Sequence, residues 1–163
     1  MENHPHDEFM LKAIEEAKRS ASFGQYTIGA VIVGPDGEIV SVAHTTTHET
    51  NDATAHGEVN AIRVACKNSG SRYLFGCWLY TTLEPCSMCT SAAIWARVEG
   101  IVFGATKEDA QNFGKNLEGK KFTWRQIDIS SKDIVEKGDP KIELFGGFMR
   151  DECLQLFDLA KNN

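Results

Sequence analysis

The chain has 163 residues, of which 42% are hydrophobic and 25% are charged, and its formal net charge is −6. These values are typical of a globular protein that buries a sizeable core, and we predict one domain over residues 1–163. No run approaches about 18 apolar residues and the polar N-terminus lacks a signal-peptide pattern, so we expect no membrane span and a cytoplasmic location. An acidic chain does not attract nucleic acid as a whole, although a local basic patch is compatible with this composition.

Hydrophobic periodicity and turn residues predict helices that alternate with strands after an opening hairpin. In chain order, the sequence predicts a helix over 7–22, strands over 27–34 and 37–44 joined by a Gly-Pro-Asp-Gly turn, a helix over 55–70, a strand over 76–83, a helix over 85–98, a strand over 100–105, a short helix over 106–114, a strand or loop over 122–130, a strand over 141–147 and a helix over 148–160. This order predicts an α/β fold with helices on both faces of a sheet, and the hairpin makes the sheet mixed.

Two of the five cysteines, Cys86 and Cys89, lie three positions apart directly after Pro85. An odd number of cysteines argues against a disulfide framework and favours metal binding or catalysis by the close pair. Taken alone, the pair has three other interpretations: a redox motif, half of a structural zinc site, or two unrelated thiols.

A histidine motif strengthens the metal interpretation. His56 and the cysteine pair both fall at predicted helix N-termini, and Cys86 and Cys89 share one helical face. A helix N-terminus lowers the pKa of a thiol toward the thiolate that metals bind. Two thiolates and one imidazole make three ligands for a single Zn²⁺ and leave the fourth position open, as catalysis requires.

Glu58 stands two positions after the predicted histidine ligand. A carboxylate there can lie beside the metal without binding it, and can carry a proton from water to a substrate nitrogen. His-x-Glu followed by Pro-Cys-x-x-Cys is the signature of zinc nucleobase deaminases. We therefore predict that Glu58 is catalytic.

The chain resembles the cytidine/deoxycytidylate deaminase superfamily, in the branch of tRNA adenosine deaminases, guanine deaminases and cytosine deaminases. The resemblance rests on the stretches IGAVIV, NDATAHGEVNAIR, LYTTLEPCSMC, AAIWARVEGIVFGA and GGFMRDEC. It implies a three-layer α/β/α cytidine-deaminase-like fold with a mixed five-stranded sheet flanked by helices. It also implies one zinc ion held by His56, Cys86 and Cys89, Glu58 as the proton shuttle, and a homodimer or higher homo-oligomer.

Within this branch the sequence carries mixed signals about the substrate. Gly57 gives the His-Gly-Glu form similar to cytosine deaminases, and Thr45 stands where the family usually has an asparagine that contacts a substrate oxygen. Glu84 belongs to a Leu-Glu-Pro-Cys stretch similar to the tRNA enzymes, and Asp109 lies in the irregular segment 106–140. We predict substrate contacts from these four residues.

The same irregular segment holds Phe113, Phe122 and Trp124, which are either core residues or a lid over the substrate.

We expect a hydrolytic deaminase that releases ammonia from a heterocyclic amine, with a free nucleobase or nucleoside of guanine or cytosine type as the substrate. The C-terminal stretch DLAKNN lacks a basic cluster, which makes tRNA a disfavoured partner. The alternatives are a tRNA adenosine deaminase and a catalytically silent deaminase-like subunit.

Overall fold

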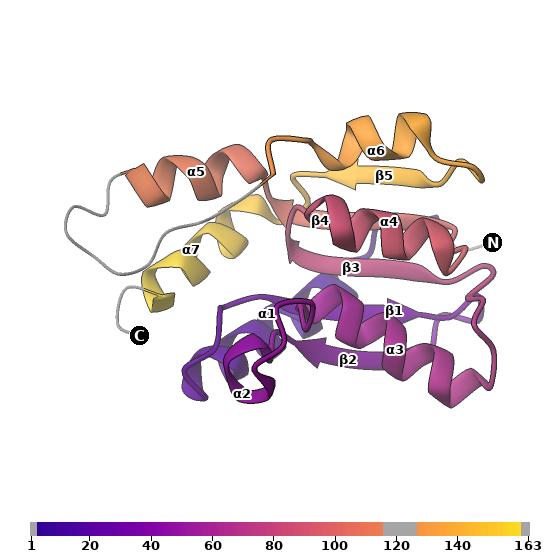
Figure 1. The fold of residues 1–163 in the computed structure, drawn as a ribbon, viewed down its shortest axis with the longest axis horizontal. Coiled ribbons are helices and arrows are strands. Elements are labelled where there is room, and N and C mark those ends of the chain that lie inside the picture. The colour runs from indigo at the N-terminus through magenta and orange to yellow at the C-terminus, as the bar shows by residue number, and fades with distance from the viewer. Residues whose placement is uncertain (1–2, 116–126, 161–163) are drawn as a thin grey trace.

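The computed structural model describes residues 3–115 and 127–160 and contains one five-stranded sheet between layers of helices (Figure 1). The strands are β1 (Gly29–Val33), β2 (Ile39–His44), β3 (Trp78–Leu83), β4 (Gly100–Ala105) and β5 (Glu143–Gly146), in the spatial order β2-β1-β3-β4-β5. β1 runs antiparallel to β2 and β3, whereas β3, β4 and β5 are parallel. The predicted mixed five-stranded α/β fold is confirmed.

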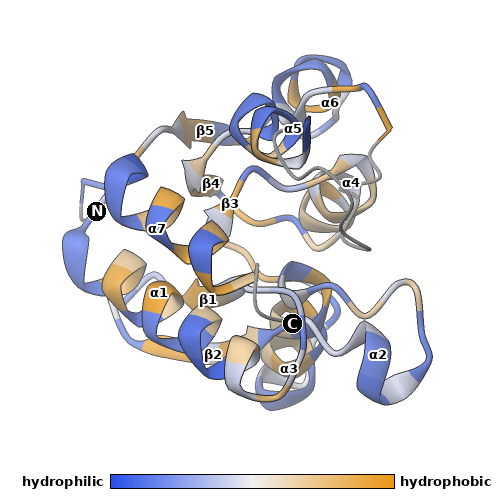
Figure 2. Cartoon of the chain, turned by 90° about the vertical axis from the view of Figure 1, so that its left-hand side faces the viewer, coloured by the Kyte–Doolittle hydropathy of each residue, from blue (hydrophilic) through white to orange (hydrophobic). Residues whose placement is uncertain are grey.

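The helices are α1 (Asp7–Ser22), α2 (Thr47–Thr50), α3 (Gly57–Ser69), α4 (Ser87–Trp95), α5 (Lys107–Lys115), α6 (Ser131–Lys137) and α7 (Arg150–Ala160). α1 and α7 pack side by side on one face of the sheet, and both mix hydrophobic and hydrophilic residues (Figure 2). α3 and α4 cover the other face, with α6 packed against α4 (Figure 1). None of the described helices is both long and apolar enough to cross a membrane.

Strand β1 shows why the central strands are unbroken runs of apolar residues in the sequence. Val31 and Val33 belong to the core beneath α1 and α7, whereas Ala30 and Ile32 belong to the core beneath α3 and α4. Successive strand side chains point to opposite faces, and both faces of this sheet are covered by helices. All five residues of β1 are therefore buried.

The first helix has the predicted bounds, and α3 ends before Gly70, whose φ of 64° closes the helix as the sequence predicts. Two short helices, α2 and α6, were not predicted. A capping box between Ser130 and Asp133 starts α6, and the Ser-x-x-Asp spacing was its available signal. Of the predicted strand or loop over 122–130, residues 127–130 form no strand, and the remainder lies outside the described residues.

The topology brings the two motif-bearing helices to one edge of the sheet. β2 and β3 run in the same direction, because both are antiparallel to β1. α3 follows β2 and α4 follows β3, and these two helices also contact each other. Their N-termini therefore meet beyond the carboxyl ends of β2 and β3.

Candidate metal centre and active site

The N-termini of α3 and α4 present His56 and Cys86. Each is the N-cap residue of its helix with an extended backbone, and neither side chain caps its own helix. Cys89 lies in the first turn of α4, on the same side as Cys86, as the spacing predicts. Both N-cap side chains thus remain available for a shared ligand.

The distances among the three donors fit one tetrahedral zinc ion. The Cys86 and Cys89 Sγ atoms are 3.6 Å apart, and His56 Nδ1 lies 3.7 Å from Cys86 Sγ and 3.5 Å from Cys89 Sγ. Zn–S bonds of about 2.3 Å and Zn–N bonds of about 2.0–2.1 Å require separations of roughly 3.5–3.8 Å in a tetrahedron. Among the histidine, cysteine and acidic side chains of the described residues, this trio is the group whose donor atoms lie close enough together to hold a metal ion.

The protonation of the two thiols is coupled, because they share a short contact. The hydrogen bond with Cys89, together with the contact with His56, lowers the pKa of Cys86 to about 4. The same contact, together with burial, raises the pKa of Cys89 well above its usual value. One thiolate is thus formed by the protein alone, and a bound metal would replace the proton of the second.

Glu58 lies in the first turn of α3 and is only 3% exposed. Burial, and then the charge of Cys86, raise the pKa of its carboxyl group to about 7. Its Oε2 atom is buried without a hydrogen-bond partner among the described residues. A carboxyl group with this pKa can both accept and release a proton near neutral pH.

His56, Glu58 and Cys86 open into a cleft. Ile28, Leu83 and Pro85 also line it. So do Lys107, Ile127 and Ile129, which come from the connection between β4 and β5 and which we call the outer wall. The cleft thus combines five apolar side chains with a few polar groups beside the metal-binding trio, an arrangement typical of sites for small organic ligands.

Glu84 also lines the cleft, but its carboxylate is already engaged within the chain. Oε2 accepts a hydrogen bond from the Lys107 backbone N–H at 2.9 Å, and Oε1 accepts from the Ser131 backbone N–H and hydroxyl, both at 2.9 Å. Glu84 therefore ties the start of α5 to the start of α6, on either side of the outer wall. Its predicted contact with substrate stays a prediction.

Asp109 does not line the cleft formed by the described residues. Its carboxylate accepts hydrogen bonds from Arg150 Nε at 2.9 Å, from Arg150 Nη2, and from the Thr106 backbone N–H. The Arg150 guanidinium lowers the pKa of this carboxyl group. In this structure Asp109 joins α5 to α7, and a substrate contact would require it to leave these partners.

Thr45 and Gly57 lie together behind the start of α3. Thr45 is 2% exposed, and its hydroxyl has no hydrogen-bond partner among the described residues. A Cβ atom on Gly57 would meet the Ile28 oxygen at 3.2 Å and the Thr45 nitrogen at 3.3 Å. The glycine thus lets α3 begin in tight contact with this backbone, a packing reason for the His-Gly-Glu form. Substrate contacts from both residues remain predictions.

The predicted lid is only partly visible in the described residues. Phe113 packs against Phe157, with ring centroids 5.1 Å apart, and is partly buried against the core beneath α1 and α7. Phe122 and Trp124 lie outside the described residues. Sequence reasoning missed Lys107, Ile127 and Ile129 as cleft residues, and no local motif marks them.

Comparison with known proteins agrees with this geometry. Residues 3–105 match the family model described as the cytidine and deoxycytidylate deaminase zinc-binding region. This match includes the metal-binding trio and Glu58, and it ends just before the outer wall begins at Lys107.

Individual relatives include two kinds of deaminase. The chain is 48% identical over 99 residues to a tRNA-specific adenosine deaminase of Aquifex aeolicus, covering 60% of this chain and 65% of that protein. It is 39% identical over 129 residues to a guanine deaminase of Bacillus subtilis, covering 78% and 80%. Among solved structures, one from studies of A-to-I editing by tRNA:A34 deaminases has a TM-score of 0.75 at 28% identity, covering 93% of this chain and 99% of that one.

Proposed function

The chain belongs to the cytidine and deoxycytidylate deaminase family, and from this premise we propose that it hydrolyses the exocyclic amine of a small nitrogen heterocycle. Members of this family are zinc-dependent hydrolytic deaminases. The observation that carries the proposal is the buried Glu58 carboxyl group, which lines the same cleft as His56 and Cys86, two of the three metal donors; Cys89 completes the trio. These four residues supply the signature's metal site and its proton carrier.

His56, Cys86 and Cys89 would hold the zinc ion in this mechanism. Zinc bound there would lower the pKa of a water molecule to about 7 and thus supply a nucleophile at neutral pH. The protein's own contribution is to fix three donors at three corners of a tetrahedron and to leave the fourth position open to the cleft. The apolar side chains of Ile28 and Leu83 exclude bulk water from the reacting atoms.

Glu58 would move the protons that the reaction requires. Water adds to the ring carbon that bears the amine, and one water proton passes through Glu58 to the adjacent ring nitrogen. The C–N bond then breaks as Glu58 delivers the second proton to the leaving nitrogen, so the products are a ring carbonyl and ammonia. A carboxyl pKa of about 7 suits a group that must accept and donate in turn.

We propose a free nucleobase or nucleoside of guanine or cytosine type as the substrate. The match to the Bacillus subtilis guanine deaminase covers 78% of this chain, against 60% for the Aquifex adenosine deaminase, and so extends further beyond the metal motifs. The cleft is lined largely by apolar side chains, and the net charge of −6 gives no general attraction for a polyanion.

tRNA adenosine deamination is the second candidate. The tRNA-specific adenosine deaminases of Aquifex aeolicus and Bacillus subtilis are 48% and 45% identical to this chain where they match, which exceeds the identity to the guanine deaminase. The chain covers less than two thirds of the length of either enzyme. The sequence-based expectation that tRNA is disfavoured is therefore not supported by the comparisons, and both substrate classes must be tested.

A catalytically silent subunit, the third alternative, is disfavoured by the intact donor set and by Glu58. An inactive relative has no need to keep a carboxyl group buried beside the cleft with one oxygen lacking a hydrogen-bond partner among the described residues, because such burial costs stability.

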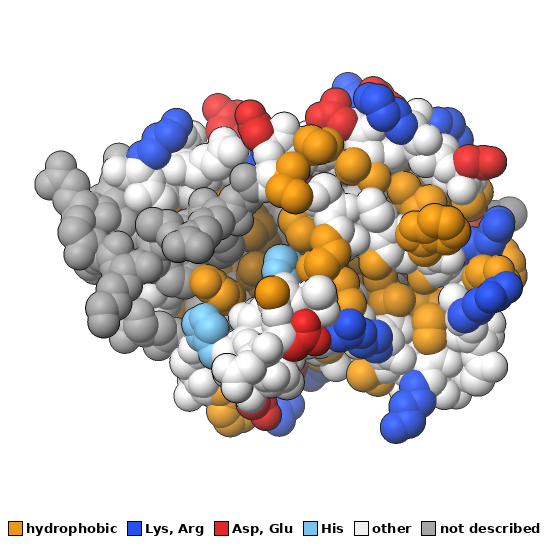
Figure 3. Space-filling view, in the orientation of Figure 1, with side chains coloured by type: hydrophobic (Ala, Val, Ile, Leu, Met, Phe, Trp, Pro, Cys, Tyr) orange, Lys and Arg blue, Asp and Glu red, His pale blue; other side chains and the backbone are white. Residues whose placement is uncertain are grey.

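We also propose that the protein is a homodimer that buries the outer face of α4. This helix contains no charged residue, and Trp95 at its end is 82% exposed. Tyr73 and Ile94 line a groove beside Trp95, and hydrophobic side chains gather broadly on this face (Figure 3). Exposed apolar patches of this kind mark interfaces. Sedimentation of the wild type and of Trp95→Glu tests this proposal, with a dimer expected only for the wild type.

One screen would test the proposed reaction. The zinc-loaded protein is incubated with guanine, cytosine, adenine and their nucleosides, and separately with a tRNA that carries adenosine in the anticodon. Ammonia release and inosine formation are measured in parallel. Ammonia from a free base or nucleoside supports the preferred substrate, and inosine in tRNA alone would replace it with the second candidate. Zinc binding without either product would favour a silent subunit.

A further inference from the structure

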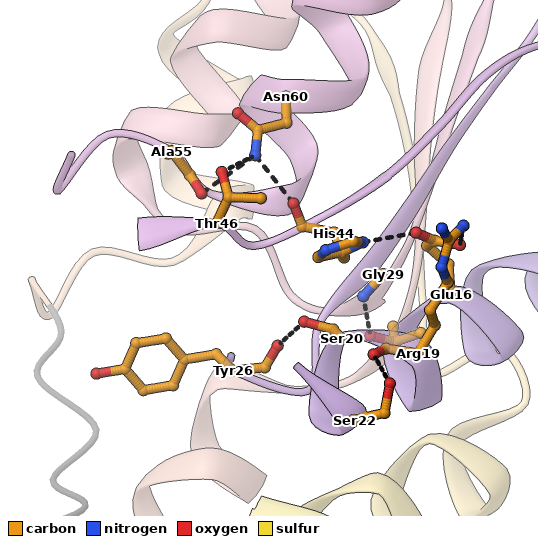
Figure 4. Close-up of polar contacts among 11 residues, drawn as sticks. Glu16, Arg19, Ser20, Ser22, Tyr26, Gly29, His44, Thr46, Ala55 and Asn60 are labelled. Carbon is orange, nitrogen blue, oxygen red and sulfur yellow. Dashed lines mark hydrogen bonds and ion pairs between the residues drawn. The ribbon is translucent and has the colours of Figure 1, made fainter. Parts of the chain in front are cut away.

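We propose that Asn60 is a positioning residue that fixes His56 as a metal ligand. Asn60 lies in α3, one turn after His56, and its side-chain amide nitrogen contacts three acceptors (Figure 4). It lies 2.9 Å from the His44 carbonyl oxygen, 3.0 Å from the Thr46 hydroxyl and 3.3 Å from the Ala55 carbonyl oxygen. The inference rests on the proposed use of His56 as a ligand and adds a residue outside the zinc signature.

The three acceptors stand at the two ends of one loop. His44 ends β2 and Thr46 follows it, whereas Ala55 directly precedes His56. The Thr46 backbone N–H also donates to the Ala55 oxygen at 2.9 Å, which closes the loop at its base. Asn60 thus holds both ends of the loop from within the helix that the loop enters.

The contacts of the Asn60 amide, which we call the tether, take the place of the N-cap side-chain hydrogen bond that α3 lacks. His56 is the N-cap residue of α3, and its side chain makes no capping hydrogen bond. Helices usually gain fixed N-termini from an N-cap side chain, but a metal-binding imidazole cannot serve that purpose. Asn60 instead restrains the backbone on the N-terminal side of His56, while its own backbone N–H bonds to the His56 oxygen at 2.9 Å.

The far end of the tether is itself anchored. His44 Nδ1 lies 2.6 Å from Glu16 Oε1 of α1, and the two side chains are only 15% and 10% exposed (Figure 4). His44 is therefore held through its ring by α1 and through its carbonyl oxygen by α3. A tether to a fixed point limits the motion of the tethered residue, so the Asn60 contacts can set where His56 stands relative to the cysteines.

The test compares two variants of Asn60 with a matched asparagine on the same helix. Asn60→Ala removes the amide, and Asn60→Asp keeps its shape but cannot donate to the two carbonyl oxygens. Asn68→Ala is the control, because Asn68 also donates from α3 to a β2 carbonyl, that of Val40 at 3.1 Å, far along the helix from His56. Each protein is loaded with Co²⁺ for its absorption spectrum and with Zn²⁺ for the rate of release to a chelator.

Both Asn60 variants are expected to release zinc about tenfold faster or more, because supporting partners of a ligand typically alter metal affinity 10–100-fold. Their Co²⁺ bands should shift or weaken, whereas Asn68→Ala should match the wild type in both measurements. Thermal unfolding without metal measures general destabilisation, which should be larger for the Asn60 variants because Asn60 is partly buried and Asn68 is exposed. Zinc release and Co²⁺ spectra are therefore compared well below the unfolding temperature of each variant.

Two results would overturn the inference: one would leave the proposed metal site intact, and the other would refute it as well. Wild-type zinc release and Co²⁺ spectra in both Asn60 variants, with His56→Ala free of zinc, would exclude the positioning role and leave the metal site intact. Full zinc content in His56→Ala would instead remove His56 from the ligands, and would refute the proposed metal site together with this inference.

Discussion

The metal-binding trio and the outer wall both belong to the surroundings of one cleft, but the chain builds them in different ways. The trio comes from two helix N-termini that the parallel directions of β2 and β3 bring to one sheet edge. Lys107, Ile127 and Ile129 come from the connection between β4 and β5, and Glu84 holds the ends of that connection. The family match includes the first region and ends before the second. We infer that the first sets the reaction and the second selects the substrate.

Loss of a cysteine ligand should give the largest effect, because the metal serves both folding and chemistry. We expect Cys86→Ala to lose stoichiometric zinc and detectable turnover. Zinc at about 100 times its Kd adds about 2.7 kcal/mol to stability, so the variant should also unfold at a lower temperature. Metal analysis and thermal unfolding measure both effects. Cys66→Ala is the control, since Cys66 lies outside the trio, and an equal loss there would mean that the effect is not specific.

Replacement of Glu58, the proposed proton carrier, should remove turnover but keep the metal. General acid–base catalysis typically contributes about 10²–10⁴-fold, and a group that acts in successive steps belongs at the upper end of that range. We therefore expect Glu58→Gln to bind zinc and fold normally while turnover falls by about 10⁴-fold. Zinc content and rate are measured on the same preparation, with exposed Glu8→Gln as the control. Near-normal turnover with full zinc would rule out the proposed mechanism.

The difference between the two regions also explains what the sequence could predict. The sequence predicts the metal donors and the nearby carboxylate, because ligand spacing and helix N-termini leave a local pattern at His56, Glu58, Cys86 and Cys89. Ile127 and Ile129 carry no such pattern, since their position depends on the long-range bonds of Glu84 rather than on their neighbours. The helix α1 and the central strands were likewise predicted because their hydrophobic periodicity is a local pattern.

The short α2 and α6 were missed because elements of four and seven residues carry too few turns to show a helical period.

A change at Glu84 should weaken substrate binding more than it slows the chemical step. In Glu84→Gln, one carboxylate oxygen becomes a donor that faces an N–H group of Lys107 or Ser131. An unmatched buried group costs about 1–3 kcal/mol, and about 1.4 kcal/mol corresponds to a tenfold change. We expect KM to rise about tenfold for every substrate, with zinc content and kcat nearly unchanged. The exposed Glu99→Gln is the control.

A changed ranking among substrates in Glu84→Gln, rather than a uniform rise in KM, would instead favour the direct substrate contact predicted from the sequence.

The smallest effect is expected at Thr45, which lies behind the start of α3 and belongs to neither region. Thr45 and Thr81 are both buried, and neither hydroxyl has a hydrogen-bond partner among the described residues. Because replacing an unpaired buried hydroxyl by a methyl group of similar shape is nearly neutral or stabilising, Thr45→Val and Thr81→Val should unfold at or slightly above the wild-type temperature. If the Thr45 hydroxyl serves substrate recognition, only Thr45→Val should change the ranking of substrates by kcat/KM, by a factor of about ten or less, since one hydrogen bond contributes about 0.5–1.5 kcal/mol. An unchanged ranking in Thr45→Val would show that recognition lies elsewhere in the cleft and would leave Thr45 as a packing residue behind α3.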